Sequence, residues 1–208
     1  MGYNWYRLTM KKSLITLLFM LFYIIVYGQE TVGTFNMEYF AEEGVKKIEC
    51  TNPDANDFNV YIGAVGNHAS DEVYLRIKGN DLDNFKIAFI QLRDKFVEWA
   101  TVARENNVTD MVKEFDISLP KMTVCWLSSK WWFSFNQRLT PKFLVLKDGK
   151  CAMVLSKKVN ASSNEYIDQT LYFVLTSKEE FDDVLGLLDI QKMKDVFSKK
   201  ESKEDLFH

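Results

Sequence analysis

The segment 122–139 carries the side chains best suited to bind a ligand. It has the pattern of two strands, and an even loop at Ser128-Ser129 would pair Trp126 with Trp131. An odd loop would mix apolar and polar side chains on both faces, so we predict the even register. The outward face then holds five candidate binding residues: Thr123, Trp132, Ser134, Asn136 and Arg138. An exposed Trp beside amide and guanidinium groups can stack on a sugar ring or grip a protein partner.

The alternative for this hairpin is that the long helix or another sheet covers the same face. A large exposed Trp is uncommon on protein surfaces, which favours coverage. Exposure of Trp132 therefore decides between a binding patch and an ordinary part of the core.

Patterns for catalysis or metal binding are few in this chain. His68 falls in a predicted turn and His208 is the last residue, so a solvated histidine is favoured over a catalytic one. Residues 52–57 offer oxygen atoms at alternate positions, but they lack the Gly and distal Glu of a calcium loop. The acid pairs Glu179-Glu180 and Asp182-Asp183 would need a shared cleft for glycoside chemistry. We predict no catalytic residue, no metal and no cofactor.

Three cysteines, Cys50, Cys125 and Cys151, match no metal-binding spacing. An odd number leaves at least one thiol unpaired if the other two form a disulfide. The favoured interpretation is three small buried hydrophobic side chains. A single disulfide between any two of them is the alternative, and the sequence does not choose a pair.

Residues 1–28 resemble a bacterial export signal. Lys11 and Lys12 precede an apolar block of 14 residues, Leu14–Tyr27, which is shorter than the about 20 residues of a spanning helix. We expect cleavage before Gln29, and we expect residues 1–9 to be either dispensable or to precede a true start of translation at Met10. An uncleaved anchor or a buried helix is the alternative. The signal predicts a periplasmic or extracellular protein without a stable membrane span after cleavage.

The predicted mature chain starts at Gln29 and is mildly acidic. Removing Arg7, Lys11 and Lys12 leaves 23 basic residues against 29 acidic ones, a net charge of −6. Nucleic acid binding needs clustered cations, so this balance argues against it. We predict a single globular domain over residues 29–198, followed by a charged tail over 199–208.

Hydrophobic periodicity predicts an α+β fold. About nine largely antiparallel strands, in one sheet or two, pack against one long helix at about 81–106 and a C-terminal helical pair. A first hairpin would place Tyr39 opposite Ile48, and Asp148-Gly149 marks another hairpin. Ser177 and Glu180 form a capping-box pattern. Residues 110–119 are expected to form a loop with a turn of helix.

The sequence therefore favours a non-catalytic binding or interaction module that acts outside the cytoplasm. Its partner would be a protein or a carbohydrate, and nucleic acid is not expected. The alternatives are a carboxylate-dependent hydrolase acting outside the cytoplasm and a component of envelope structure or assembly.

Overall fold

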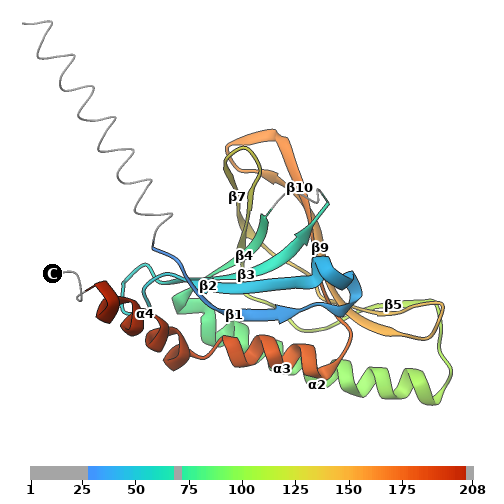
Figure 1. The fold of residues 1–208 in the computed structure, drawn as a ribbon. Helices are drawn as coiled ribbons and strands as arrows, with labels where there is room; N and C mark the ends of the chain where they lie inside the picture. Colours follow the sequence, from blue (N-terminus) through green and yellow to red (C-terminus); the bar gives the residue numbers. More distant parts are fainter. Residues whose placement is uncertain (1–27, 68–71, 205–208) are drawn as a thin grey trace, which may run out of the picture.

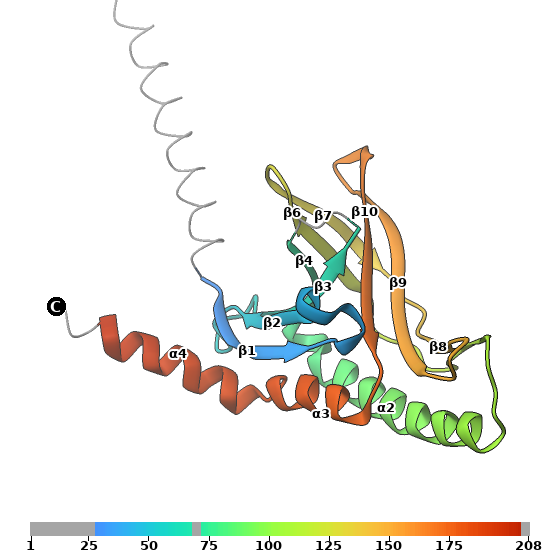
Figure 2. The same cartoon turned by 45° about the vertical axis from the view of Figure 1, so that its right-hand side comes forward.

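The computed structural model describes residues 28–67 and 72–204 and shows an α+β fold (Figures 1 and 2). Ten antiparallel strands in this part of the chain form one sheet. They are β1 (Glu30–Asn36), β2 (Val45–Cys50), β3 (Asn59–Gly66), β4 (Glu72–Lys78), β5 (Met111–Glu114), β6 (Met122–Leu127), β7 (Trp131–Gln137), β8 (Lys142–Val145), β9 (Cys151–Ala161) and β10 (Asn164–Leu175). The helical segments are η1 (Glu38–Gly44), η2 (Gly79–Asp81), α2 (Leu82–Glu105), α3 (Lys178–Leu187) and α4 (Ile190–Glu204).

The predicted fold class is confirmed, including the long helix and the C-terminal helices. The tenth strand is β5, where a loop with a helical turn was predicted. Among the described strands this short edge strand pairs with β8 alone, and most of its side chains are exposed, so it lacks the alternating burial that identifies strands. The predicted leader, except for Gly28, lies outside the described residues. Within the described chain, no helix has both the length and the apolarity required to span a membrane.

The strands follow the order β5-β8-β9-β10-β3-β4-β6-β7, and the sheet branches at β3. One edge of β3 pairs with β4, while the other edge pairs with β2 and, near Gly66, with β10. The sheet curves until the turn after β9 meets the edge strand β7, where Ser162 N donates to Phe133 O over 2.8 Å. This contact protects an edge that would otherwise be open to pairing with another chain.

The main core lies between one face of the sheet and the helices. Figures 1 and 2 show α2, α3 and α4 together on one side, with β7 and the far ends of β9 and β10 projecting away from them. Phe85, Phe89, Leu92 and Phe96 form the predicted buried stripe of α2. The opposite face of β3, β4, β6 and β7 is therefore not covered by these helices.

The predicted first hairpin is wrong in register. Gly33, rather than Tyr39, lies opposite Ile48, because η1 occupies the connection between β1 and β2. Met37 is buried, and its N donates to Gly44 O over 3.0 Å to close this connection. A Cβ atom at Gly44 would lie 2.0 Å from Met37 O, so the close approach requires glycine.

Candidate ligand-binding surface

The hairpin of β6 and β7 has an odd loop, so the predicted even register is wrong by one residue. Leu127 pairs with Trp131 and Trp126 pairs with Trp132, across the three-residue loop Ser128–Lys130. A shift of one residue moves every side chain of a strand to the opposite face of the sheet. The side chains that β7 presents outward are therefore different from those predicted.

The five predicted binding residues do not come together on one face. Thr123 lies on the outward face as predicted, opposite Arg76 of β4. Trp132 packs against the main core, and Ser134 is a buried residue of β7 on the same side as Trp132. Asn136, with a φ of 55°, sits at the irregular end of the strand pairing, and Arg138 lies beyond the end of β7. Both of these residues are exposed, but neither belongs to the outward row of β7.

Three aromatic side chains, Trp131, Phe133 and Phe135, form the outward row of β7, which we call the aromatic ladder. Neighbouring ring centroids are 6.5 and 6.0 Å apart, and the ring planes differ by 27° and 3°. Phe135 is 48% exposed, whereas Trp131 and Phe133 are half-buried. The ladder continues onto β4 through Tyr74, whose ring lies 6.0 Å from Trp131.

Two members of the ladder, Trp131 and Phe133, pack against a second hydrophobic cluster on the outward face of the sheet. This cluster contains Tyr61, Tyr74 and the fully buried Cys125. The observed register of β7 therefore buries nearly as much apolar surface as the predicted one, because apolar neighbours are present on both faces of the sheet. Tyr61 and Tyr74 each lie between two core residues of their strands, so alternation places both rings on the outward face. Two large aromatic side chains at outward positions are the signal that could have identified this cluster.

Acidic groups lie at the Tyr74 end of the ladder. The Tyr74 hydroxyl donates to Glu72 Oε2 over 3.0 Å, and Lys47 pairs with Glu49 over 3.0 Å. The Lys47 ammonium group lies 5.9 Å from the centre of the Tyr74 ring. Burial, together with the Glu49 and Glu72 carboxylates, raises the pKa of Tyr74 well above its ordinary value. This phenol therefore stays protonated and remains a donor at any physiological pH.

Cationic groups lie at the Phe135 end. The Arg76 guanidinium is 6.0 Å from the centre of the Phe135 ring, and its Nη2 donates to Thr123 Oγ1 over 3.3 Å. Arg76 Nε is buried and has no hydrogen-bond partner among the described residues. Lys78 follows two positions along β4 and so extends from the same face of the sheet.

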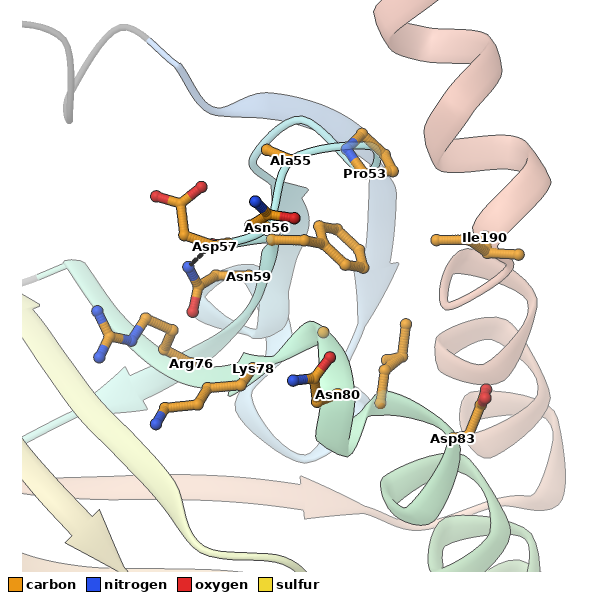
Figure 3. Close-up of a pocket in the computed structure, with 13 residues that line it drawn as sticks. Pro53, Ala55, Asn56, Asp57, Asn59, Arg76, Lys78, Asn80, Asp83 and Ile190 are labelled. Carbon is orange, nitrogen blue, oxygen red and sulfur yellow. Dashed lines mark hydrogen bonds between the residues drawn. The ribbon is translucent and has the colours of Figure 1, made fainter.

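Arg76 also lines a pocket of about 870 Å³ (Figure 3). Its lining comes from the loop before β3, the end of β4, η2, the start of α2 and Ile190 of α4. Figure 3 shows Arg76 and Lys78 extending to the same side, with Asn59 and Asn80 nearby. Cations and amides thus line the part of the pocket that adjoins the aromatic ladder.

Residues 52–57, whose oxygen atoms partly match a calcium loop, form one wall of this pocket as a polar turn. Asn52 Oδ1 accepts a hydrogen bond from Asp54 N over 2.9 Å, and Asp54 pairs with Lys194 over 2.6 Å. Within residues 28–67 and 72–204, no three His, Cys, Asp or Glu side chains form a group that could hold a metal ion. The local contacts therefore account for these oxygen atoms as turn and surface groups.

Carboxylates near the pocket do not form a close pair. Asp57 and Asp83 both line it, but Figure 3 shows them on opposite sides, with the Asp57 carboxylate directed away. Glu180 is buried in the capping box of α3, and Asp182 pairs with Arg93 over 2.8 Å. The hydrogen bond from Lys178, followed by that from Arg93, lowers the pKa of Asp182. Glu180 and Asp182 therefore have structural partners of their own.

Protein-family models, curated proteins and solved structures were compared with this chain. None of them matches it. The function is therefore argued from the chemistry of the surface itself, which combines half-exposed aromatic rings, a cationic pair and an amide-lined pocket. His68 lies outside the described residues and takes no part in this argument.

All three cysteines are free thiols, and none forms a disulfide. Cys50 and Cys125 are buried, and burial raises the pKa of each to about 12. Cys151 is half-buried, and burial also raises its pKa. The two buried cysteines fill space as small apolar side chains, as predicted.

We expect only Cys151 to react rapidly with an aromatic disulfide reagent in the folded protein at pH 8. A thiol with a pKa of about 12 is deprotonated to the extent of roughly 10⁻⁴ at this pH, and the thiolate is the reactive form. The absorbance of the released thiolate should report one fast equivalent before denaturation and three after it. Replacing Cys151 with serine should remove the fast phase. Three fast equivalents in the folded protein would contradict this assignment.

Proposed function

We propose that this protein is a non-catalytic binding protein that holds a saccharide chain on the aromatic ladder. The observation that supports the proposal is the row of parallel, half-exposed rings ending at Phe135, which is 48% exposed. Aromatic rings offer a large rigid surface at low entropic cost, and a pyranose presents a matching apolar face of C–H groups. The predicted export signal is consistent with a ligand encountered in the periplasm or outside the cell.

The polar groups beside the ladder favour a saccharide over a protein partner. Asn56, Asn59 and Asn80 line the adjoining pocket, and amides can both donate to and accept from sugar hydroxyls. A stable protein interface generally buries about 800 Å² on each partner around a desolvated apolar centre. A single row of three rings, flanked by charged and amide groups, is better matched to a narrow polar chain.

Replacing Phe135 with alanine is expected to weaken saccharide binding about tenfold, because an aromatic stacking contact contributes on the order of 1–2 kcal/mol. Isothermal titration calorimetry with a panel of oligosaccharides measures this effect. The panel contains a neutral glucan, polygalacturonate and methyl-esterified polygalacturonate. The unmodified protein should bind at least one member of this panel.

Tyr166 provides the matched control, because it is 86% exposed on β10 and lies outside the ladder. Replacing Tyr166 with alanine should leave the affinity unchanged. A protein that binds no saccharide of the panel would contradict the proposed function. Equal losses for the Phe135 and Tyr166 variants would show that the ladder is not the binding surface.

A further inference from the structure

We propose that the saccharide is acidic and that Arg76 and Lys78 bind its negative group. This inference rests on the proposed function and adds the chemical class of the ligand. The negative group is a carboxylate or a sulfate, because both present the oxygen atoms that a guanidinium and an ammonium group bind.

The two cations lie beside the end of the aromatic ladder. Arg76 lies 6.0 Å from the ring of Phe135, the most exposed member of the ladder. Lys78 lies two residues further along β4, on the same face and away from Tyr74. A chain stacked on the ladder and continued past Phe135 therefore reaches Arg76 and then Lys78 at the pocket (Figure 3).

Arg76 and Lys78 form no ion pair with the described acidic residues. Some cations of this protein are held by carboxylates: Arg93 contacts Asp94 and Asp182, and Lys47 contacts Glu49. Among the described residues, neither Arg76 nor Lys78 takes part in any of the ion pairs found. Two neighbouring positive charges outside any ion pair repel each other, and an anionic ligand would relieve that repulsion.

The Arg76 guanidinium has one buried N–H donor without an acceptor among the described residues. Its Nη2 donates to Thr123, which fixes one side of the guanidinium, while the buried Nε has no partner among the described residues. Buried donors without acceptors are rare, because each loses its hydrogen bonds to water without replacement. An anionic oxygen placed beside the guanidinium could supply the acceptor and the opposite charge together.

The acidic groups around the surface restrict where the negative group can lie. Glu72 lies near Tyr74, at the far end of the ladder. Glu49 lies two strands from Arg76 and pairs with Lys47. Asp57 and Asp83 line the pocket on opposite sides, with the Asp57 carboxylate directed away. A negative group would be repelled at each of these places. The charge distribution therefore directs it to the Arg76 and Lys78 side, and so sets the direction of the bound chain.

The decisive experiment compares two forms of one polymer, polygalacturonate and its methyl ester, by calorimetry with the intact protein. Both forms present the same sugar rings, but only the first carries charge. We expect polygalacturonate to bind at least tenfold more tightly at low salt, and this advantage should shrink as salt is raised. Replacing Lys78 with alanine should reduce polygalacturonate affinity about fivefold and leave binding of the ester unchanged.

Lys147 provides the control, because it is an exposed lysine in the loop between β8 and β9, far from β4 in the sheet. Replacing Lys147 with alanine changes the net charge equally and should not alter affinity. Dextran sulfate, tested beside neutral dextran, separates the two sources of charge. Binding of dextran sulfate that depends on Lys78, with no such binding of polygalacturonate, would assign the site to sulfated rather than carboxylated sugars.

The outcomes distinguish this inference from the proposed function. If the acid and the ester bind equally and loss of Lys78 changes neither, the acidic ligand is ruled out while the saccharide surface remains. If a neutral glucan binds and both charged polymers do not, the acidic ligand is also ruled out. If no polymer binds, the proposed function fails together with the inference.

Discussion

Replacing Phe89 with alanine is expected to lower the free energy of unfolding by about 3–5 kcal/mol. Phe89 is fully buried in α2, and its ring lies 5.3 Å from Phe85, 6.2 Å from Phe173 of β10 and 5.2 Å from Phe181 of α3. One side chain therefore joins the long helix, the sheet and the C-terminal helices. Its removal leaves a cavity and takes a partner from three other rings, so both the transfer and the packing contributions are lost.

Urea unfolding followed by circular dichroism measures this change, with Ile87→Ala as the control on the same helix. Ile87 is 57% exposed, and alanine has the higher helix propensity, so the control should change stability by less than about 1 kcal/mol. Losses of similar size for the two variants would show that Phe89 does not hold α2 against the sheet.

The helices and one turn were predictable because each depends on a single, local requirement. α2 needs one buried stripe, and Phe85, Phe89 and Phe96 recur at helical spacing. α3 begins at a capping box that uses Ser177 and Glu180, and the structure confirms both of its hydrogen bonds. The turn between β8 and β9 uses Gly149 at a φ of 81°, a conformation that glycine adopts without strain.

The register of β6 and β7 was not predictable from alternation, because this rule assumes that only one face of the sheet is apolar. Here Trp126 and Trp132 pair on the core side, while Cys125 and Phe133 pair within the outward cluster. Both registers bury aromatic side chains, so the apolar pattern does not distinguish them. The loop decides, and its length of three residues could not be determined from the sequence.

The ambiguity in strand register also explains why the predicted binding residues and the observed outward residues lie in the same hairpin but differ. The hairpin was predicted to carry the candidate binding residues with Trp132 outward, but Trp131, Phe133 and Phe135 lie on the outward face instead. Arg76 lies on the outward face of β4, between the buried core positions Leu75 and Ile77, as alternation along a strand requires. Arg76 and Lys78 lie near the ladder because β4, β6 and β7 are neighbours in the sheet, and this strand order could not be read from the sequence.

A second large loss of stability is expected at Glu180, which is only 4% exposed and yet carries a carboxylate. Its Oε1 accepts from Glu38 N over 2.7 Å, and its Oε2 accepts from Ser177 N over 2.8 Å and from Thr176 Oγ1 over 2.8 Å. Thr176 N donates to the same oxygen. The carboxylate thus joins the start of α3 to η1, two segments more than 130 positions apart in the chain. Both oxygens are required as acceptors.

Glu180→Gln should therefore lower the free energy of unfolding by about 2–4 kcal/mol, although the side chain keeps its size. An amide must turn its NH₂ group toward one set of these N–H donors, which leaves at least one buried donor without an acceptor. Glu179→Gln removes the same charge from the same turn of α3, but Glu179 is exposed, so its loss should stay below about 0.5 kcal/mol. Urea unfolding of the two variants separates the local hydrogen bonds from the general effect of charge at the start of the helix. If both variants lost equal stability, the charge near the helix terminus would be the cause, and the carboxylate would not hold η1 against α3.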